Sequence, residues 1–329
     1  MKFSDIVGQQ KMKEHFRTAI SAGKVGHAYI IEGPKSSGKM LMAKALAQTL
    51  LCENGGTEPC CSCPACAKAE SGNHPDLIYV THEKPNAISV DEIRTQVVED
   101  IAIKPYEGRR KIYIIDDADR MNPNAQNAIL KTIEEPPAYG LILLLTDNAN
   151  NFLQTIRSRC LKLAMTPATV PEISKFLQEK HGLAPGTADI YAGLAQGSVG
   201  LAVNLAFDDE KNNLRESVLA IMGNIMDCDA SQLCDYLDTL RNEKDNILEI
   251  LDIMTIWFRD VLLYKSVGQI KDLIYREKTE EIIKTAQNCS YAGVTASLEA
   301  IDSAKARLRF NVNYDLIIEL LLRTFKEKL

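Results

Sequence analysis

The fold that this sequence predicts is decided by residues 111–119, KIYIIDDAD. Residues 112–115 form a short apolar run rich in β-branched and aromatic side chains, with no break before its acidic end. Such a run is typical of a buried strand in a parallel sheet. In open α/β sheets, ligands bind at the carboxyl ends of the strands. Asp116 and Asp117 are therefore candidate site residues.

The residues that follow continue the alternation of strand and helix. Residues 125–135 carry apolar side chains at helical spacing until two prolines stop the helix. A second buried run, residues 141–145, is followed by Thr146, and a polar segment then leads to the tripeptide SRC at residues 158–160. The predicted unit is strand, acids, helix, strand, polar residue and arginine.

An earlier glycine-rich segment predicts a phosphate-binding loop for the same sheet. Residues 27–32 are typical of a strand, residues 33–39, GPKSSGK, of a loop, and residues 40–51 of a helix. Glycines let backbone N–H groups point at phosphate, the helix N-terminus adds positive potential, and a lysine reaches the terminal phosphates. The candidate phosphate-binding residues are Gly33, Gly38 and Lys39.

One position departs from a working loop of this type. A Ser or Thr hydroxyl normally holds magnesium there, whereas this sequence has Met40. A thioether is a poor ligand for a hard cation that requires oxygen at near-octahedral geometry. We therefore expect weak or magnesium-insensitive ATP binding and no efficient hydrolysis.

A cysteine-rich insertion at residues 52–66 predicts a zinc site. Its spacing, C-x7-C-x2-C-x2-C, lets four thiolates close a tetrahedral site with zinc–sulfur distances of about 2.3 Å. Four protein ligands leave no open position for catalysis, so we expect the zinc to be structural. The predicted ligands are Cys52, Cys60, Cys63 and Cys66.

The other cysteines and a nearby histidine have simpler interpretations. Cys61 is the spare residue of the insertion, and a cluster of free thiols is the alternative to a metal site. His74 is an alternative ligand, but its position before Pro75 at a strand entrance favours a structural histidine. Four further cysteines lie in apolar surroundings and are expected to behave as small core residues: Cys160, Cys228, Cys234 and Cys289.

Composition and length limit the classes of function. The chain has 329 residues, a formal net charge of −6 and 25% charged residues. Its length suggests two or three domains. The charge balance argues against binding duplex DNA through bulk positive charge, although a local patch or a partner can bring a protein to DNA. No signal-like segment or long apolar run is present, so we expect a soluble cytoplasmic protein without membrane contact.

The chain changes character after residue 166. Residues 1–166 alternate strand and helix patterns, with further elements predicted at 77–80 and from residue 88. Residues 167–207 are typical of a small helical unit, and residues 208–329 show only amphipathic helices. The expected architecture is an α/β P-loop module with a parallel sheet, a small helical domain and an all-α C-terminal interaction domain; the family resemblance described below implies that this last domain serves oligomerisation.

Together these motifs resemble the AAA+ ATPase modules of the clamp-loader clade. The motifs are the phosphate loop, the acidic strand end, Thr146 and the SRC tripeptide. The cysteine insertion and the run NAILKTIEEPP at residues 127–137 narrow the resemblance to the delta-prime family of bacterial DNA polymerase III clamp-loader subunits. The resemblance is strong over residues 1–207. It is weaker over the helical end, where residues 256–260, IWFRD, and 311–313, NVN, are similar to the family's collar domain.

The resemblance implies roles for residues that match the family's motifs. Arg159 is similar to the arginine finger, which reaches from its own subunit to the ATP of a neighbour and stabilises the charge that develops on the γ-phosphate. The alternative is an ion-paired structural arginine, the role expected for Arg157. The resemblance also implies a degenerate nucleotide site with Val7 and Gly8 on its adenine side. Its other residues are Gly33, Gly38, Lys39, Asp116, Asp117 and Thr146.

Three departures from an active member of the family accompany the intact Arg159. Met40 replaces the hydroxyl, Asp117 stands where the catalytic glutamate would be, and Gly200 stands where an active member's helical lid carries an arginine. A carboxylate shortened by one methylene is held away from the attacking water, and a misplacement of about 1 Å can lower the rate about 10²-fold. This combination fits a subunit that completes another subunit's site and does not hydrolyse ATP in its own.

The leading hypothesis is a non-hydrolysing stator of a heteropentameric ring that loads the sliding clamp onto primed DNA. The expected partners are the gamma/tau and delta subunits, with the sliding clamp and primer–template DNA reached through the assembled complex. One alternative is an ATP-hydrolysing motor subunit of the same clade, which the three departures disfavour. Another is a stand-alone zinc-dependent nucleic-acid binder, which the acidic net charge and the helical domains weaken.

Overall fold

The computed structural model describes residues 1–82, 87–270, 273–308 and 313–328. The chain divides into two compact units, Met1–Val203 and Asn204–Leu329. The first unit contains the sheet and most of the helical segment that follows it. The domain boundaries expected at residues 166 and 207 stay predictions. Of the collar motif at 311–313, residues 311 and 312 lie outside the described residues.

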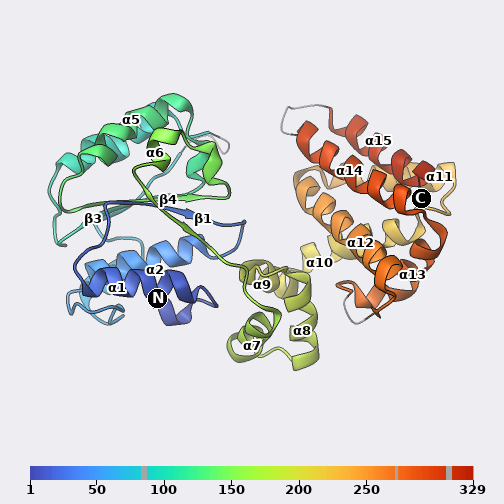
Figure 1. The fold of residues 1–329 in the computed structure, drawn as a ribbon, viewed down its shortest axis with the longest axis horizontal. Helices are drawn as coiled ribbons and strands as arrows, with labels where there is room; N and C mark the ends of the chain where they lie inside the picture. The colour runs from blue at the N-terminus through green and yellow to red at the C-terminus, as the bar shows by residue number, and fades with distance from the viewer. Residues whose placement is uncertain (83–86, 271–272, 309–312, 329) are drawn as a thin grey trace. The chain divides into compact units, whose positions relative to one another are not determined.

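A five-stranded parallel sheet forms the centre of the first unit (Figure 1). Its strand order is β2-β3-β4-β1-β5, and β3 and β4 are buried along their whole length, as their apolar runs predicted. Glu32 at the end of β1 pairs with Thr146 at the end of β4, so both strands end at one edge of the sheet. The strands are β1 Ala28–Glu32, β2 Leu77–Tyr79, β3 Lys111–Ile115, β4 Gly140–Thr146 and β5 Leu161–Ala164.

The sequence pattern missed β5. This strand lies at the edge of the sheet beside β1, and its Leu161 is 48% exposed. Lys162 interrupts the apolar character of the strand and forms an ion pair of 2.8 Å with Glu32. A short, exposed edge strand has no continuous apolar run, so only its backbone pairing with β1 identifies it.

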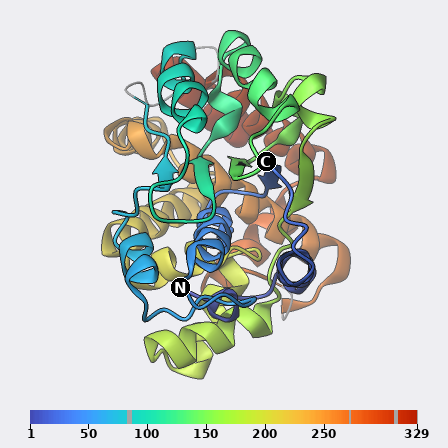
Figure 2. The ribbon, with the colours of Figure 1, turned by 90° about the vertical axis from the view of Figure 1, so that its left-hand side faces the viewer.

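Helices cover both faces of the sheet (Figures 1 and 2). On one face α1 and α2 pack around Phe16, Tyr29 and Met42, and on the other α5 and α6 pack around Ile129 and Ile156, all fully buried. The helices are α1 Gln10–Ser21, α2 Lys39–Leu51, α3 Pro64–Glu70, α4 Val90–Ile93 with a π-helical continuation Arg94–Glu99, α5 Pro123–Glu134 and α6 Gln154–Arg157.

Local hydrogen bonds explain where two of these helices begin. The Ser89 hydroxyl accepts the N–H of Glu92 at 3.3 Å, and the Glu92 carboxylate accepts the N–H of Ser89 at 2.6 Å. This reciprocal capping box makes Ser89 the cap of α4. Asn122 caps α5 by accepting the N–H of Ala125 at 2.9 Å, with Pro123 at the first helical position.

Three helices follow the sheet in the chain and share a small core of their own. Ile173 and Leu177 from the first of them pack against Ala188 and Ala192 from the second. These helices agree with the helical character predicted for residues 167–207, in which the first helix begins at Val170. The helices are α7 Val170–His181, α8 Pro185–Leu194 and α9 Val199–Phe207.

The elements that the structure describes in the second unit are all helices, as predicted. Its core contains the fully buried Trp257 and Phe258, and the ring of Phe258 lies 4.9 Å from that of Phe325 between centroids. Asp260, also buried, accepts the N–H groups of Ile274 and Tyr275 at 2.7 and 2.8 Å. The helices are α10 Asp209–Asn224, α11 Ala230–Asn242, α12 Ile247–Val267, α13 Thr279–Asn288, α14 Tyr291–Leu308 and α15 Tyr314–Lys328.

Cys234 corrects one expectation from the sequence. Cys160, Cys228 and Cys289 are buried as predicted, whereas Cys234 is exposed because it lies in the first part of α11, whose buried side chains come later in the helix.

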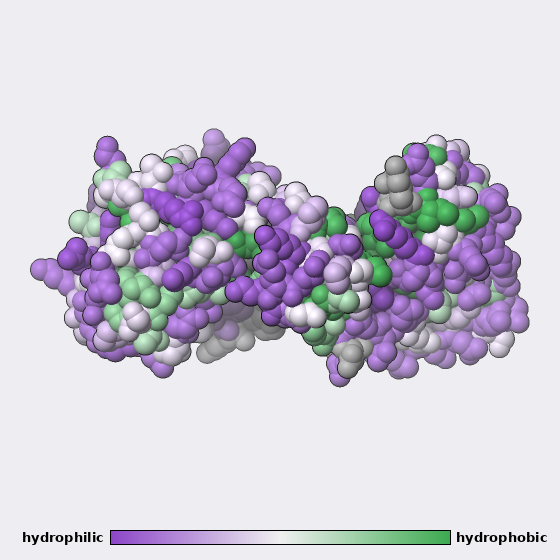
Figure 3. All heavy atoms as spheres, turned by 90° about the horizontal axis from the view of Figure 1, so that it is seen from below, coloured by the Kyte–Doolittle hydropathy of each residue, from purple (hydrophilic) through white to green (hydrophobic). Residues whose placement is uncertain are grey.

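On the face shown in Figure 3, hydrophilic residues predominate. Within the part of the chain that the structure describes, no helix has the length and apolarity needed to cross a membrane.

Candidate functional site

The phosphate loop of residues 33–39 connects β1 to α2. Gly33 donates its N–H to the Thr146 carbonyl at 3.0 Å, which fixes the loop to the end of β4. Gly38 has a φ of 94° and precedes the first residue of α2, so a residue with a side chain would be strained there. A Cβ on Gly33 would lie 2.7 Å from Cβ of Met165. Both glycines are therefore required for the shape of the loop, and Met165 covers it.

Lys39 is turned back into its own loop. Its side chain is only 8% exposed, and its Nζ donates to the carbonyls of Gly33 and Pro34 at 2.7 and 3.1 Å. The same Nζ forms an ion pair with Asp147, which directly follows β4. The lysine charge is thus compensated inside the chain, and a nucleotide phosphate would have to displace Asp147 to reach it.

The first turn of α9 lies directly on the phosphate loop. The Ser198 hydroxyl donates to the Ser36 carbonyl at 3.0 Å, and the Gly200 N–H donates to the same oxygen at 3.1 Å. A Cβ on Gly200 would lie 2.8 Å from that oxygen. Position 200 therefore has no room for a side chain without movement of α9.

The acidic end of β3 is engaged locally. Asp117 has a φ of 44°, in the left-handed region, and its carboxylate forms an ion pair of 2.8 Å with Arg120. The Asp116 carboxylate accepts the N–H of Asp117 at 3.1 Å. At the end of β4, the Thr146 hydroxyl accepts the N–H of Asn148 at 3.0 Å. The Asp117 carboxylate and the Thr146 hydroxyl are thus both engaged by residues of the turns that directly follow their strands.

The predicted adenine-side segment lies beside the helices that follow the sheet. Val7 packs against the core of α7, α8 and α9. Gly8 has a φ of 62°, and a Cβ there would be in ordinary contact with Ala168, at 3.8 Å. Gln9 accepts the N–H of Thr166 at 2.9 Å through its side-chain oxygen. The structure therefore joins residues 7–9 to the start of the helical segment.

Arg159 belongs to a different region of the first unit, next to α5 and α6. Its Nε forms an ion pair of 2.9 Å with Glu134, and its Nη1 donates to the Thr155 carbonyl at 3.1 Å and the Ser158 hydroxyl at 3.2 Å. The side chain is still 40% exposed. The neighbouring Arg157 donates to Asn150 at 3.1 Å.

Three residues around these sites were not predicted from the sequence. Asp147 had a signal, because an acidic residue that directly follows a buried strand lies at the ligand-binding edge of the sheet. Glu134 lies in the run of residues 127–137 that resembles the family, but nothing in that run indicated its contact with Arg159. Met165 had no signal, because its contact with Gly33 joins segments far apart in the chain.

The four predicted cysteine ligands converge at the ends of two helices. Cys52 directly follows α2 and Cys63 caps α3. The four sulfur atoms, of Cys52, Cys60, Cys63 and Cys66, all lie within 4.8 Å of one another, with Cys60 and Cys66 3.9 Å apart. Tetrahedral zinc–sulfur bonds of about 2.3 Å require sulfur–sulfur distances of about 3.8 Å. The group can therefore hold a metal ion such as zinc.

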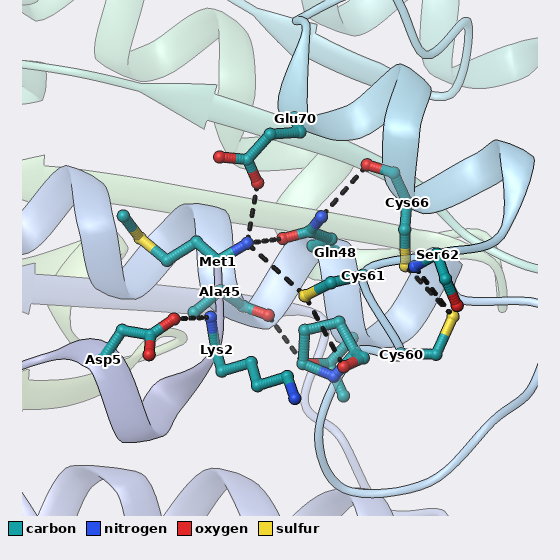
Figure 4. Close-up of polar contacts among 12 residues, drawn as sticks. Met1, Lys2, Asp5, Ala45, Gln48, Cys60, Cys61, Ser62, Cys66 and Glu70 are labelled. Atoms are coloured by element: carbon teal, nitrogen blue, oxygen red, sulfur yellow. Dashed lines mark hydrogen bonds and ion pairs between the residues drawn. The ribbon is translucent and has the colours of Figure 1, made fainter.

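Backbone N–H groups around the cluster favour thiolates. The N–H of Cys60 points at Sγ of Cys52 at 3.4 Å, and the N–H of Cys63 at Sγ of Cys60 at 3.3 Å. The N–H groups of Ser62 and Cys63 lower the pKa of Cys60 to about 5, whereas burial raises the pKa of Cys66. Figure 4 shows Gln48 of α2 donating to the Cys66 carbonyl, at 3.0 Å, and so joining the insertion to the phosphate-loop helix.

Cys61 and His74 lie outside the four-cysteine group. Cys61 is exposed. Nδ1 of His74 accepts the N–H of Asp76 at 3.1 Å, and burial lowers the pKa of the histidine. His74 thus has the local structural contact that its position before Pro75 suggested.

A phosphate loop and an acidic strand end on a five-stranded parallel sheet, followed by helical segments, define an AAA+ module of the clamp-loader type. Residues 8–169 match the family described as DNA polymerase III, delta subunit, and residues 210–327 match its C-terminal family. The chain is 32% identical over 323 residues to DNA polymerase III subunit delta' of Bacillus subtilis, covering 97% of this chain and 96% of that protein. The chain belongs to the DNA polymerase III delta' family.

Two further relatives show the range of similarity. DNA polymerase III subunit tau of Bacillus subtilis is 29% identical over 305 residues, which cover 86% of this chain and 54% of tau. A crystal structure of a DNA polymerase III gamma subunit-related protein from Thermotoga maritima is 19% identical, with a TM-score of 0.47, and covers 97% of this chain and 98% of that one.

Proposed function

We propose that this protein is the non-hydrolysing stator of a ring-shaped clamp loader and that it donates Arg159 to ATP bound by a neighbouring subunit. Membership of the delta' family supports a place in the loader beside gamma/tau and delta subunits. The sliding clamp and primed DNA would be reached through the assembled complex. The four-cysteine group would hold a structural zinc ion, because four protein ligands leave no position for a reacting water.

The observation that carries this proposal is the contrast between Arg159 and the chain's own phosphate loop. Arg159 keeps an exposed guanidinium, the group that stabilises charge on a transferring phosphoryl group. In the loop, the charge of Lys39 is compensated by Asp147. The first turn of α9 lies against Ser36 through Gly200, the position where the resemblance implies an arginine in an active subunit. Met40 offers no hydroxyl for magnesium.

The test is ATP turnover by the reconstituted loader with clamp and primed DNA. The variants are Arg159→Ala, Lys39→Ala and, as a matched control, Arg157→Ala, which removes an arginine two residues away. Arginine fingers contribute about 10³ to 10⁵ in rate at the site they complete. We expect Arg159→Ala to abolish turnover at one site of the ring, and Lys39→Ala and Arg157→Ala to leave turnover unchanged.

Two outcomes would contradict the proposal. Full turnover with Arg159→Ala would show that no neighbour uses this arginine. Loss with Lys39→Ala in a ring that still assembles would show that the loop holds a nucleotide that the ring requires, as in a motor-type subunit.

A further inference from the structure

Two motifs that are far apart in the sequence meet at Arg159. Glu134 is the last residue of α5 and belongs to the EEPP run, and Arg159 belongs to the SRC tripeptide after α6. Their side chains form an ion pair of 2.9 Å from Nε to the carboxylate. A carboxylate in the last turn of a helix is unfavourable, because the carboxyl end of the helix dipole is negative. The ion pair with Arg159, and not the stability of α5, therefore accounts for a glutamate at this position.

The contacts of Arg159 fix the guanidinium in one orientation. A guanidinium has five N–H donors in a rigid plane. Nε is ion-paired with Glu134, and Nη1 donates to the Thr155 carbonyl and to the Ser158 hydroxyl. Within the described residues, Nη2 has no partner. These three contacts thus leave the two N–H groups of Nη2 available to donate to phosphate oxygens.

We infer that Glu134 is a positioning residue, which holds Arg159 so that its Nη2 faces the γ-phosphate of ATP bound by the neighbouring subunit. This inference rests on the function proposed above. The two side chains are 43% and 40% exposed, and ion pairs this exposed contribute little to folding stability. The role of Glu134 therefore concerns geometry, and the variant without its charge is expected to fold and assemble.

The neighbouring Glu135 provides a matched control. It has the same side chain, it is exposed, and it has no side-chain partner within the described residues. Glu134→Gln and Glu135→Gln remove the same charge from adjacent positions. A comparison of the two separates the effect of the contact with Arg159 from that of net charge.

The experiment is clamp- and DNA-stimulated ATP turnover by the reconstituted loader. We expect Glu134→Gln to lower kcat about three- to tenfold, because a less ordered arginine completes the neighbour's site less often. The KM for ATP should stay unchanged, because the arginine acts in the transition state. Glu135→Gln should match the wild type. In an Arg159→Ala background, Glu134→Gln should have no further effect, because its action passes through the arginine. Glu134→Asp should restore part of the rate.

Each contrary result has its own meaning. Wild-type turnover with Glu134→Gln, when Arg159→Ala is impaired, would overturn the positioning role and leave the proposed function standing. No effect of Arg159→Ala itself would overturn the function as well. A further loss from Glu134→Gln in the Arg159→Ala background, or a raised KM, would show that Glu134 acts by another route.

Discussion

A Cβ on Gly200 would lie 2.8 Å from the carbonyl oxygen of Ser36, so the first turn of α9 and the phosphate loop touch through backbone atoms. The Gly200 N–H donates to that same oxygen at 3.1 Å. The helix is therefore held against the loop by contacts within the chain.

This contact predicts that Gly200→Ala destabilises the protein. The added methyl group must push Ser36 and α9 apart, and overpacking of this kind costs about 1–3 kcal/mol. Gly193→Ala is the control, since a Cβ there meets nothing within 4 Å and alanine favours a helix. Denaturant unfolding and hydrogen exchange at the Gly200 amide measure the effect. Equal stability of Gly200→Ala and wild type would contradict the contact.

The loop geometry also predicts how the protein binds nucleotide. Calorimetric titration should show weak ATP binding that magnesium does not change, because Met40 cannot ligate the ion. Met40→Thr should introduce magnesium dependence, and should gain less affinity than the double variant with Asp117→Glu. Tight, magnesium-dependent binding by the wild type would show that Asp147 and α9 do not restrict the loop.

The four-cysteine group predicts that the purified protein contains about one zinc ion per chain and that removing it lowers the melting temperature. Metal binding to such a group contributes directly to folding. Cys66→Ser should lose the metal, whereas Cys61→Ser should keep it, because Cys61 lies outside the group. Elemental analysis and thermal unfolding give the two readouts. An unchanged melting temperature after chelation would rule out a structural role.

Asp76 predicts a stability that depends on pH. Its carboxylate is fully buried and accepts the N–H groups of Tyr106, Glu107 and Gly108 at 2.6, 2.9 and 2.6 Å. Burial by itself raises the pKa of Asp76, but these three N–H groups outweigh it and hold the pKa below its ordinary value. The contribution of Asp76 is therefore complete above the unfolded-state pKa of about 4 and is lost as pH falls through the lower folded-state pKa.

Asp76→Asn should accordingly cost about 2–4 kcal/mol near pH 7, because an amide replaces a charged acceptor and turns an N–H group towards the donors. The difference from wild type should shrink in acid. Asp91→Asn, at an exposed position, should change the free energy of unfolding by less than about 0.5 kcal/mol. Urea unfolding measured from pH 3 to pH 8 tests this, and a difference that does not vary with pH would contradict it.

Patterns within short stretches of the sequence predicted much of this architecture. The β3 and β4 runs predicted buried strands because continuous apolar segments can be satisfied only inside a sheet covered on both faces. The spacing of the four cysteines predicted a common metal site, and the structure brings their sulfur atoms together. The exposed β5 had no such pattern, since an edge strand is defined by its neighbour.

The sequence by itself determined the parallel sheet, the phosphate loop, the cysteine group and the helical C-terminal part, because each depends on side chains that are close along the chain. Only the tertiary structure decided that α9 lies on Ser36, that Asp147 compensates Lys39 and that Glu134 holds Arg159. The Lys39–Asp147 and Glu134–Arg159 contacts join residues far apart in the chain, which the folding of the intervening helices and strands brings together. The contact between α9 and Ser36 requires the absence of a Cβ at Gly200. These three contacts form only when the strands have paired into the sheet and the helices have packed against it.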